Sequence, residues 1–468
     1  MNSIGKRLGA LGTAAVLTAA LTAPALAAEN TSGIAVQLDG QNVAFTDAAP
    51  VAKDNRTFLP FRAVFEAMGV QVSNEGNNIT ATRGDQTLRM TIGSTTATLT
   101  EGENTKTITM DVAPYVDSAS WRTYVPVRFA AEAFGCNVGW DQDDQTVIIV
   151  DVDKLMGDTT FTKMDNYISY LYEVQAEKNQ ATDGTLSLDM TVNKDLIGAA
   201  EDLKVNVDGT VTGVSSQTAA QMAMELDLSD LASLAAGDPA AMTAEQMKAL
   251  KDALAKTELE VRMDLNTGMY YIYAPVLAQA NGGSGWYSMD MNALLKQSGM
   301  DLASLVSMSK DLKLEDTLYS TLASIPLNDK DLGYQTLKTS ADLYASMFGD
   351  ASFTQKGDTY TATYTLNEGD AGSVTYTTVL TQKGDDIVSM QMDMNMSASA
   401  EGFAMATTAK VYADSTKSTI DMSMDITGMM SLTMKMDLGY KATDKAPETG
   451  LPSGVTATPL DSMLTVTP

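Results

Sequence analysis

The sequence predicts an α+β protein in two parts. A small, duplicated domain of antiparallel sheet and helices comes first, and a large antiparallel, half-barrel-like sheet with helical insertions follows. Two observations carry this prediction: a 14-residue motif occurs twice, 66 residues apart, and twelve later segments alternate apolar and polar residues. A motif repeated in full indicates one structural unit used twice, and a period of two indicates a half-buried strand.

The repeated motif runs from Arg56 to Gly69 and again from Arg122 to Gly135. Its first residues favour a strand, and a proline follows where a helix can begin, because that position needs no N–H donor. Apolar residues at i, i+3, i+4 and i+7 then predict a short amphipathic helix, and the closing glycine suits a left-handed cap. Alternation resumes after each glycine, so the unit is strand–helix–strand. Upstream, Asp39-Gly40 predicts a hairpin turn.

The first 27 residues have the features of a secretory signal peptide. Lys6 and Arg7 precede an apolar run from Leu8 to Leu26, and Ala25-Leu26-Ala27 fits a cleavage site. A retained membrane anchor is the alternative. No later stretch approaches the roughly 18 apolar residues of a membrane helix. We therefore expect a secreted, extracellular protein, free or associated with the cell wall, with no transmembrane segment after signal cleavage.

The composition excludes several classes of function. The formal net charge of −28 makes the chain acidic, which disfavours nucleic acid and other partners held through their phosphates. The chain contains no histidine, which removes His-ligated copper, His-bearing zinc sites and every catalytic triad with a histidine base. The chain therefore cannot be a copper amine oxidase. We assign no catalytic residues, no cofactor and no metal site, and predict that the protein is not an enzyme, with a carboxylate-dependent hydrolase as the less favoured alternative.

The two motif copies resemble the copper amine oxidase N-terminal domain, also called the stalk domain. The stretches Asn137 to Asp141 and Thr146 to Val150, after the second copy, add to the resemblance. It covers residues 33–152 and implies a small α+β fold of antiparallel sheet wrapped on helices. Such domains are common in secreted and surface proteins of Gram-positive bacteria. The resemblance does not imply oxidase activity, which belongs to a separate catalytic domain.

Two positions in the first domain invite a chemical interpretation. Cys136 is the only cysteine and takes the place of Val70 in the first copy, which favours a small buried side chain over a reactive thiol. The stretch Asp141 to Asp144 gathers carboxylates that could bind calcium. It lacks the glycine and the distant glutamate of an EF-hand, and its counterpart, Glu75 to Asn78, reads as a turn. A solvated turn is therefore the second interpretation.

A linker at 153–162 is predicted to precede the second domain, residues 163–445. Lys163 to Asn179 carries one apolar stripe and predicts a helix. Helical insertions are predicted at Leu231 to Ala255, with a capping box at Thr243 and Gln246, and over most of Leu294 to Phe348. Proline-rich residues 446–468 predict a flexible tail. The twelve predicted strands are Thr185 to Val192, Leu203 to Val211, Met222 to Leu228, Leu259 to Leu265, Met269 to Tyr273, Trp286 to Met291, Thr359 to Leu366, Val374 to Thr381, Ile387 to Ser397, Ala404 to Ala413, Ser418 to Ile426 and Ser431 to Tyr440.

Methionines recur on one face of three of these predicted strands, although methionine is not a favoured strand residue. Three interpretations stand: a core face, a soft-metal site for Cu(I), and an adaptable surface for an apolar ligand. For the last, the candidate ligand-lining residues are Met390, Met392, Met394, Met396, Met422 and Met424, with Met434 and Met436 repeating the pattern.

The second domain also resembles, more distantly, the half-barrel of the bacterial lipoprotein- and glycolipid-carrier superfamily. The long sheet, the inserted helices, Tyr270 to Tyr273 and Gly285 to Asp290 carry this resemblance. The expected function is non-enzymatic: a stalk domain presents a β-rich domain that binds an apolar small molecule or lipid, or a cell-wall or surface partner. A purely structural envelope component and a hydrolase with paired carboxylates are the alternatives.

Overall fold

A computed structural model describes residues 33–45, 48–53, 56–118, 120–232, 242–276, 278, 283–297, 313–400 and 403–460. The chain forms two compact units. The first comprises residues up to 158 together with 317–344, and the second comprises 159–316 with 345 onward. Helices and antiparallel sheets are present in both, which confirms the predicted α+β class. The predicted signal peptide lies outside the described residues.

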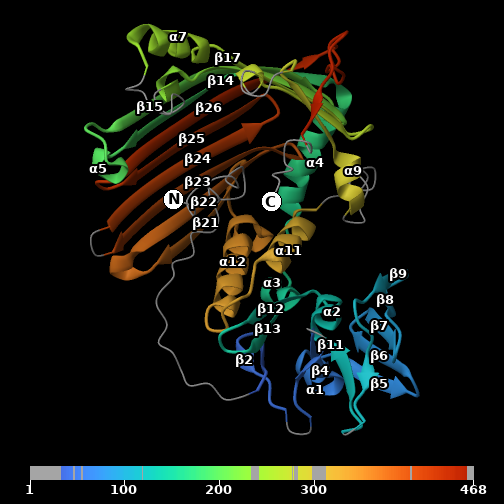
Figure 1. The fold of residues 1–468 in the computed structure, drawn as a ribbon. Coiled ribbons are helices and arrows are strands. Elements are labelled where there is room, and N and C mark those ends of the chain that lie inside the picture. The colour runs from blue at the N-terminus through green and yellow to red at the C-terminus, as the bar shows by residue number, and fades with distance from the viewer. Residues whose placement is uncertain are drawn as a thin grey trace. The chain divides into compact units, whose positions relative to one another are not determined.

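Three small sheets build the first unit (Figure 1). The repeats contribute one sheet in the order β10-β11-β4-β3 and carry one short helix each. The elements of the first unit up to residue 158 are β1 (Ala35–Leu38), β2 (Gln41–Asn42), β3 (Val51–Lys53), β4 (Arg56–Pro60), α1 (Phe61–Ala67), β5 (Gln71–Glu75), β6 (Asn78–Arg83), β7 (Gln86–Thr91), β8 (Thr96–Glu101), β9 (Asn104–Thr109), β10 (Tyr115–Val116), β11 (Thr123–Pro126), α2 (Val127–Glu132), β12 (Cys136–Asp141), β13 (Thr146–Asp151) and α3 (Val152–Met156). The other two sheets run β5-β6-β7-β8-β9 and β12-β13-β1-β2.

The two motif copies meet about a local two-fold relation. Strands β4 and β11 pair antiparallel, and Leu59 faces Val125, its own equivalent in the second copy. Both closing glycines have a left-handed backbone, with φ of +74° at Gly69 and +73° at Gly135, so the predicted caps are confirmed. Each helix begins one residue later than predicted, because the motif proline is still the last residue of its strand.

The first unit also contains a segment from far along the chain, which the sequence did not predict. Residues 317–344, placed by sequence in the second domain, belong to the first unit. They include most of the helices α11 (Leu314–Ser324) and α12 (Gly333–Phe348). The predicted linker is shorter too, since α3 occupies its first residues. The prediction that 163–445 forms one continuous domain is therefore wrong over this segment.

Strand β12 holds this inserted segment at its free edge. The side-chain amide of Asn137 donates to the carbonyl oxygens of Leu322 and Ile325 at 2.9 and 2.8 Å, and so caps the end of α11. The backbone N–H of Trp140 donates to Leu327 O at 2.9 Å. Between them, Gly139 lets the segment pass, because a Cβ built there would lie 1.8 Å from Leu327 O. The interface therefore depends on a missing side chain.

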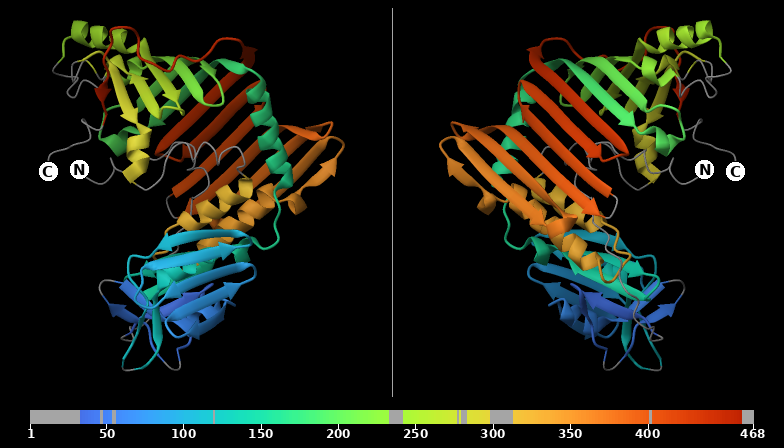
Figure 2. Two further views of the ribbon diagram at one scale, coloured as in Figure 1. Left: turned by 90° about the vertical axis from the view of Figure 1, so that its right-hand side faces the viewer. Right: turned by 90° about the vertical axis from the view of Figure 1, so that its left-hand side faces the viewer.

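The second unit is one curved sheet of fourteen strands (Figures 1 and 2). Its order is β20-β21-β22-β23-β24-β25-β26-β14-β15-β16-β17-β18-β19-β27, antiparallel except for the last pair. The strands are β14 (Asn179–Val192), β15 (Leu203–Ser215), β16 (Ala219–Asp227), β17 (Thr257–Asp264), β18 (Met269–Tyr273), β19 (Trp286–Asp290), β20 (Thr354–Lys356), β21 (Thr359–Asn367), β22 (Gly372–Lys383), β23 (Asp386–Ala400), β24 (Phe403–Asp414), β25 (Lys417–Ile426), β26 (Met430–Thr443) and β27 (Thr458–Pro459). All twelve predicted strands are present.

Short helices connect the strands. They are α5 (Lys194–Ile197), α7 (Ala244–Leu254) and α9 (Met291–Gln297), with single 3-10 turns η1 (Ser229–Leu231), η3 (Asp350–Ser352) and η4 (Gly369–Ala371), and the longer helix α4 (Thr162–Glu177) precedes β14. The predicted capping box of Thr243 and Gln246 is present at α7. The predicted flexible tail differs: Gly450 O accepts a 2.6 Å hydrogen bond from Arg262, and β27 pairs with β19. Residues 461–468 lie outside the described part.

Helix α4 begins with a cap supplied from far along the chain. Its own N-cap residue, Phe161, offers no side-chain acceptor. Asp350 accepts instead from Thr162 N at 2.9 Å, Lys163 N at 3.0 Å and Thr160 Oγ1 at 2.8 Å. Burial acts to raise the pKa of Asp350, but the Thr162 hydroxyl, which donates at 2.5 Å, and these other donors outweigh it and lower the pKa to about 2. The carboxylate therefore stabilises the helix only while it is ionised.

Replacing Gly139 with alanine should destabilise the first unit. The new Cβ cannot avoid Leu327 without moving its backbone, so we expect a loss of about 3 kcal/mol, at the upper end for overpacked interiors. Calorimetry of the full chain should show the transition of the first unit lowered by several degrees. Ser73→Ala, at the equivalent and exposed position of the first copy, is the control and should change stability by less than about 0.5 kcal/mol. An equal loss of stability in Gly139→Ala and Ser73→Ala would contradict the role given to Gly139.

Replacing Asp350 with asparagine should remove a pH-dependent contribution to stability. Because the folded pKa is below the ordinary value of 3.8, the contribution is present above about pH 4 and is lost as the pH falls toward 2. A depression of this size corresponds to about 2 kcal/mol at neutral pH. Urea unfolding followed by circular dichroism at pH 7 and pH 2.5 measures it. The gap between wild type and Asp350→Asn should shrink at the lower pH; a gap that stays constant would show that ionisation is irrelevant.

Candidate functional site

The register of the large sheet gathers its apolar side chains on one face. In antiparallel strands, two residues that face each other point to the same face of the sheet. Following the facing residues from strand to strand therefore traces a row of side chains across that face. We call the resulting surface the methionine face, because fifteen of the chain's 30 methionines lie on it. They are Met190, Met222, Met224, Met263, Met289, Met390, Met392, Met394, Met396, Met405, Met422, Met424, Met430, Met434 and Met436.

All six candidate methionines belong to this face, on β23 and β25. Strand β24 lies between them and presents small residues there, including Ala409 and Thr407. Neighbouring strands are about 4.8 Å apart, so long side chains from β23 and β25 can meet over β24. One row runs Met394, Ala409, Met422, Met434, Leu188, and the next runs Met392, Val411, Ile420, Met436, Leu186.

Burial differs along the methionine face. Met394 is 7% exposed and Leu380 is fully buried, so the part over β22 and β23 resembles a core. The other five candidate methionines are half-buried, as are the facing residues of β25, β26 and β14. Met222 on β16 is 39% exposed. The face is thus a core at one side and an open apolar surface over the middle strands, and Met394 does not line that open part.

Three buried hydroxyls on this face lack a hydrogen-bond partner among the described residues: those of Tyr287, Thr378 and Thr407. Thr407 faces Met396 on one side and Met424 on the other, in the middle of the candidate residues. A buried polar group without a partner is costly and calls for an explanation. The sequence analysis did not single out either threonine. Each occupies a position of its strand where the alternation calls for an apolar residue, and a polar residue at such a position could have drawn attention to it.

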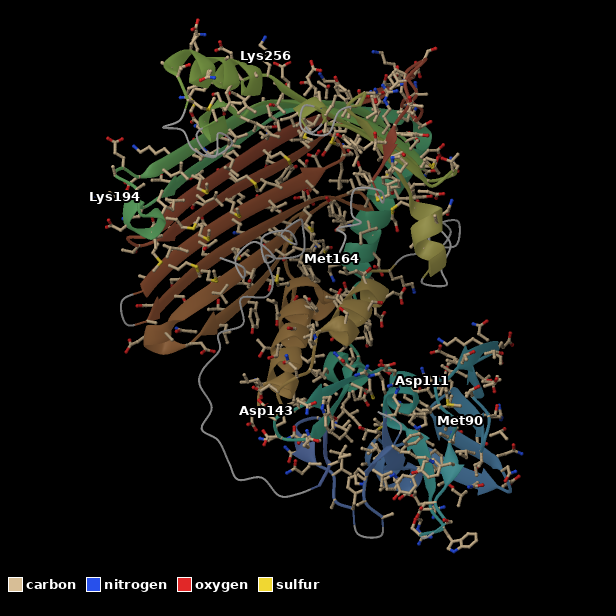
Figure 3. All side chains as sticks on the ribbon, viewed as in Figure 1. Met90, Asp111, Asp143, Met164, Lys194 and Lys256 are labelled. Atoms are coloured by element: carbon tan, nitrogen blue, oxygen red, sulfur yellow. The ribbon has the colours of Figure 1, made fainter. Side chains whose placement is uncertain are left out.

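Helix α4 covers one end of the methionine face (Figure 2). Tyr167 donates to Ala413 O at 3.0 Å and is buried, and burial raises the pKa of its hydroxyl. Met164, labelled on α4 in Figure 3, is buried as well. A cavity of about 220 Å³ remains between α4 and the sheet, next to Leu171, Ser418 and Tyr440. The six candidate methionines are not among the described residues that line it.

The opposite face of the sheet is polar. A shallow hollow of about 610 Å³ lies there, lined by residues that include Lys410, Lys435, Asp421 and Asp437. The hollow is larger than the cavity under α4, but its charges alternate in sign, and Asp437 also pairs with Lys417 at 3.2 Å. Such a surface is well solvated, and exposed pairs of this kind contribute little to stability or binding. The methionine face is therefore the stronger candidate in this unit.

The Asp141 carboxylate, which could have bound calcium, accepts hydrogen bonds from backbone N–H groups. One Asp141 oxygen accepts from the backbone N–H groups of Asp143 and Asp144, both at 3.0 Å, and the other accepts from Lys330 N at 2.9 Å. Burial acts to raise the pKa of Asp141, but these donors outweigh it and lower the pKa. The carboxylate serves the turn and the inserted segment. Within the described ranges, no three His, Cys, Asp or Glu residues are grouped to hold a metal.

Cys136 lies in the core of the first unit, 2% exposed, among Val70, Phe134 and the other buried residues. Burial raises the pKa of its thiol, so the nucleophilic thiolate is scarce at neutral pH. This agrees with the predicted role as a small buried side chain. Of the helices that the structure describes, none is both long and apolar enough to cross a membrane.

Comparison with known proteins bears on the first unit. No curated protein matches the chain in sequence. A solved structure titled "Asymmetric conductivity of engineered proteins" aligns with 56% of this chain and all of that chain, at 10% identity and a TM-score of 0.14, which is too low to carry an argument. Residues 37–149 match the family described as copper amine oxidase N-terminal domain. The first unit therefore contains a copper amine oxidase N-terminal domain, as the repeated motif predicted.

Proposed function

We propose that this is a secreted or cell-surface, non-enzymatic protein whose β-rich unit binds an apolar ligand, a lipid or another small molecule, on the methionine face. The observation that supports the proposal is the half-buried, continuous apolar surface over β23 to β26 and β14. Monomeric soluble proteins rarely expose large contiguous apolar surfaces, and those that do use them for ligands or partners. The first unit serves as a stalk that presents this surface.

Methionine suits such a role better than other apolar residues. Its unbranched, polarizable side chain adapts to ligands of different shape, whereas leucine and valine hold fixed rotamers. The hydroxyl of Thr407 is buried between Met396 and Met424 and has no partner among the described residues, so a ligand that inserts between these methionines would give it one. An amphiphile with one hydrogen-bonding group near its chain fits that pattern. The sequence features of a signal peptide support export.

Substituting three half-buried methionines tests this proposal. In the variant Met392→Leu, Met396→Leu, Met424→Leu, each change keeps the apolar character and approximate volume, so stability should change by less than about 1.5 kcal/mol per site. Binding of a fluorescent fatty-acid probe should weaken several-fold, because leucine adapts less well to the ligand. Fluorescence titration and thermal melting give the two readouts.

The control for that variant changes exposed residues on the polar face of the same strands. Asn395→Ala with Asp425→Ala should leave probe binding at the wild-type level. Absence of probe binding by wild type would favour a purely structural envelope component. Loss of Cu(I) affinity in the triple leucine variant, with no change for the probe, would favour a soft-metal site instead.

The protein should also lack amine oxidase activity, because the chain has no histidine to ligate the copper of such an enzyme. Purified protein with added copper should release no peroxide from primary amines above a copper-only blank. A histidine-containing amine oxidase, assayed in parallel, is the positive control. Peroxide release that rises with copper bound to this protein would refute the prediction.

A further inference from the structure

A hollow of about 610 Å³ lies beside α1 in the first unit, at the free edge of β5. Phe45 and Phe61 form part of its apolar wall, and Arg62, Asn74 and Arg122 are among its polar residues. Trp121 also lines it and is 77% exposed, far more than an indole normally is. None of these residues is used by the methionine face or by the inserted segment.

Trp121 is held in a costly conformation. Its φ of +56° is uncommon for any side chain other than glycine, asparagine or aspartate. The turn that imposes this backbone is fixed by Asp117, which accepts from Trp121 N at 2.8 Å through its backbone and from Ser120 N at 2.7 Å through its side chain. The equivalent residue of the first copy is Asn55, a residue that tolerates such a backbone. Strain of this kind persists at ligand sites, where an exposed side chain must be held in place.

The duplicated domain shows what this kind of surface can do. In the second copy, the equivalent edge strand is β12, and its Trp140 N–H binds Leu327 O of the inserted segment. In the first copy, the equivalent residue Asn74 is exposed and borders the hollow. The same structural position is therefore a docking surface in one copy and an open hollow in the other.

The occupant of the open copy differs from a polypeptide strand. Gly139 allows the inserted backbone to approach β12, whereas the equivalent residue here is Ser73, whose side chain blocks the same approach. The hollow offers instead an exposed aromatic plane beside planar hydrogen-bonding groups: the guanidinium groups of Arg62 and Arg122 and the amide of Asn74, which is oriented by a 3.3 Å bond to Thr123. A pyranose sugar has matching chemistry, with apolar C–H faces and hydroxyls around the ring.

We propose that this hollow, which we call the Trp121 site, binds a pyranose oligosaccharide. One ring stacks on the indole of Trp121, and neighbouring hydroxyls bond to Asn74, Ser73 and the two arginines. Two arginines and one acid, Glu66, make the rim less acidic than the chain as a whole, so a sugar carrying a carboxylate is also accommodated. The Trp121 site does not depend on the apolar ligand proposed for the other unit, so an experiment can refute either proposal without affecting the other.

Calorimetric titration of the full exported chain with cellotetraose, chitotetraose and xylotetraose tests the Trp121 site. Wild type should bind at least one of the three saturably, with a change in tryptophan fluorescence. Trp121→Asn removes the aromatic plane and relieves the strained backbone, so affinity should fall at least tenfold while the melting temperature stays equal or rises. Leu196→Asn, a change at an exposed apolar residue of α5, should bind as wild type does.

A second pair of variants keeps the test decisive if Trp121→Asn folds poorly. Trp121→Phe retains an aromatic plane and should keep part of the affinity, whereas Trp121→Leu should lose it. Absence of heat with all three oligosaccharides overturns the proposal, and so does equal affinity in the Phe and Leu variants. Binding of an extended peptide or a second copy of the chain at this site, in place of sugars, would overturn it as well.

Discussion

The register of the fourteen-stranded sheet is the constraint on which the second unit depends. Side chains alternate between faces, so a slip of one residue in β23 would move Met392 and Met394 to the polar side and turn Asp393 toward the apolar side. The neighbouring strands on both sides of β23 disfavour that slip. Only in the observed register do Met392 and Met394 face the apolar residues Val411 and Tyr376. The methionine face is thus a collective property of the sheet.

Exposure of that face is the unusual feature. Burying an apolar side chain contributes roughly 25 cal/mol per Å² removed from water. The middle strands leave much of that contribution unused, since Met422, Met424 and Met434 are only half-buried. Helix α4 covers one end and is fixed there by the distant Asp350. A sheet selected for stability alone would gain by closing over its centre, and an open centre is what a ligand surface requires.

The sequence predicts most of the elements and few of their long-range partners. Period-two alternation was enough to locate twelve of the fourteen strands of the large sheet, because each has one apolar face, but it missed the short edge strands β20 and β27. It missed the first six residues of β14, where Asn179 to Gly184 do not alternate. It could not place the helices α11 and α12, since an apolar stripe such as that of Leu318 and Leu322 does not identify the sheet it covers. For the candidate site, methionine spacing identified the face, but the degree of burial depends on tertiary packing.

Duplication explains how one small domain can do two different things. The copies share strand, helix and cap, so their edge strands β5 and β12 are equivalent in structure. The difference lies in single residues: glycine at 139 admits the backbone of Leu327, and serine at 73 does not. An unprotected edge strand can pair with another chain. Because the inserted segment occupies the edge of β12, that strand is no longer open to such pairing. The first edge is protected differently, because the Ser73 side chain blocks the approach of another backbone and an open hollow lined by aromatic and hydrogen-bonding groups lies beside it. Divergence at a few positions of a repeated motif is therefore sufficient to turn one copy into an internal interface and leave the other open to the outside.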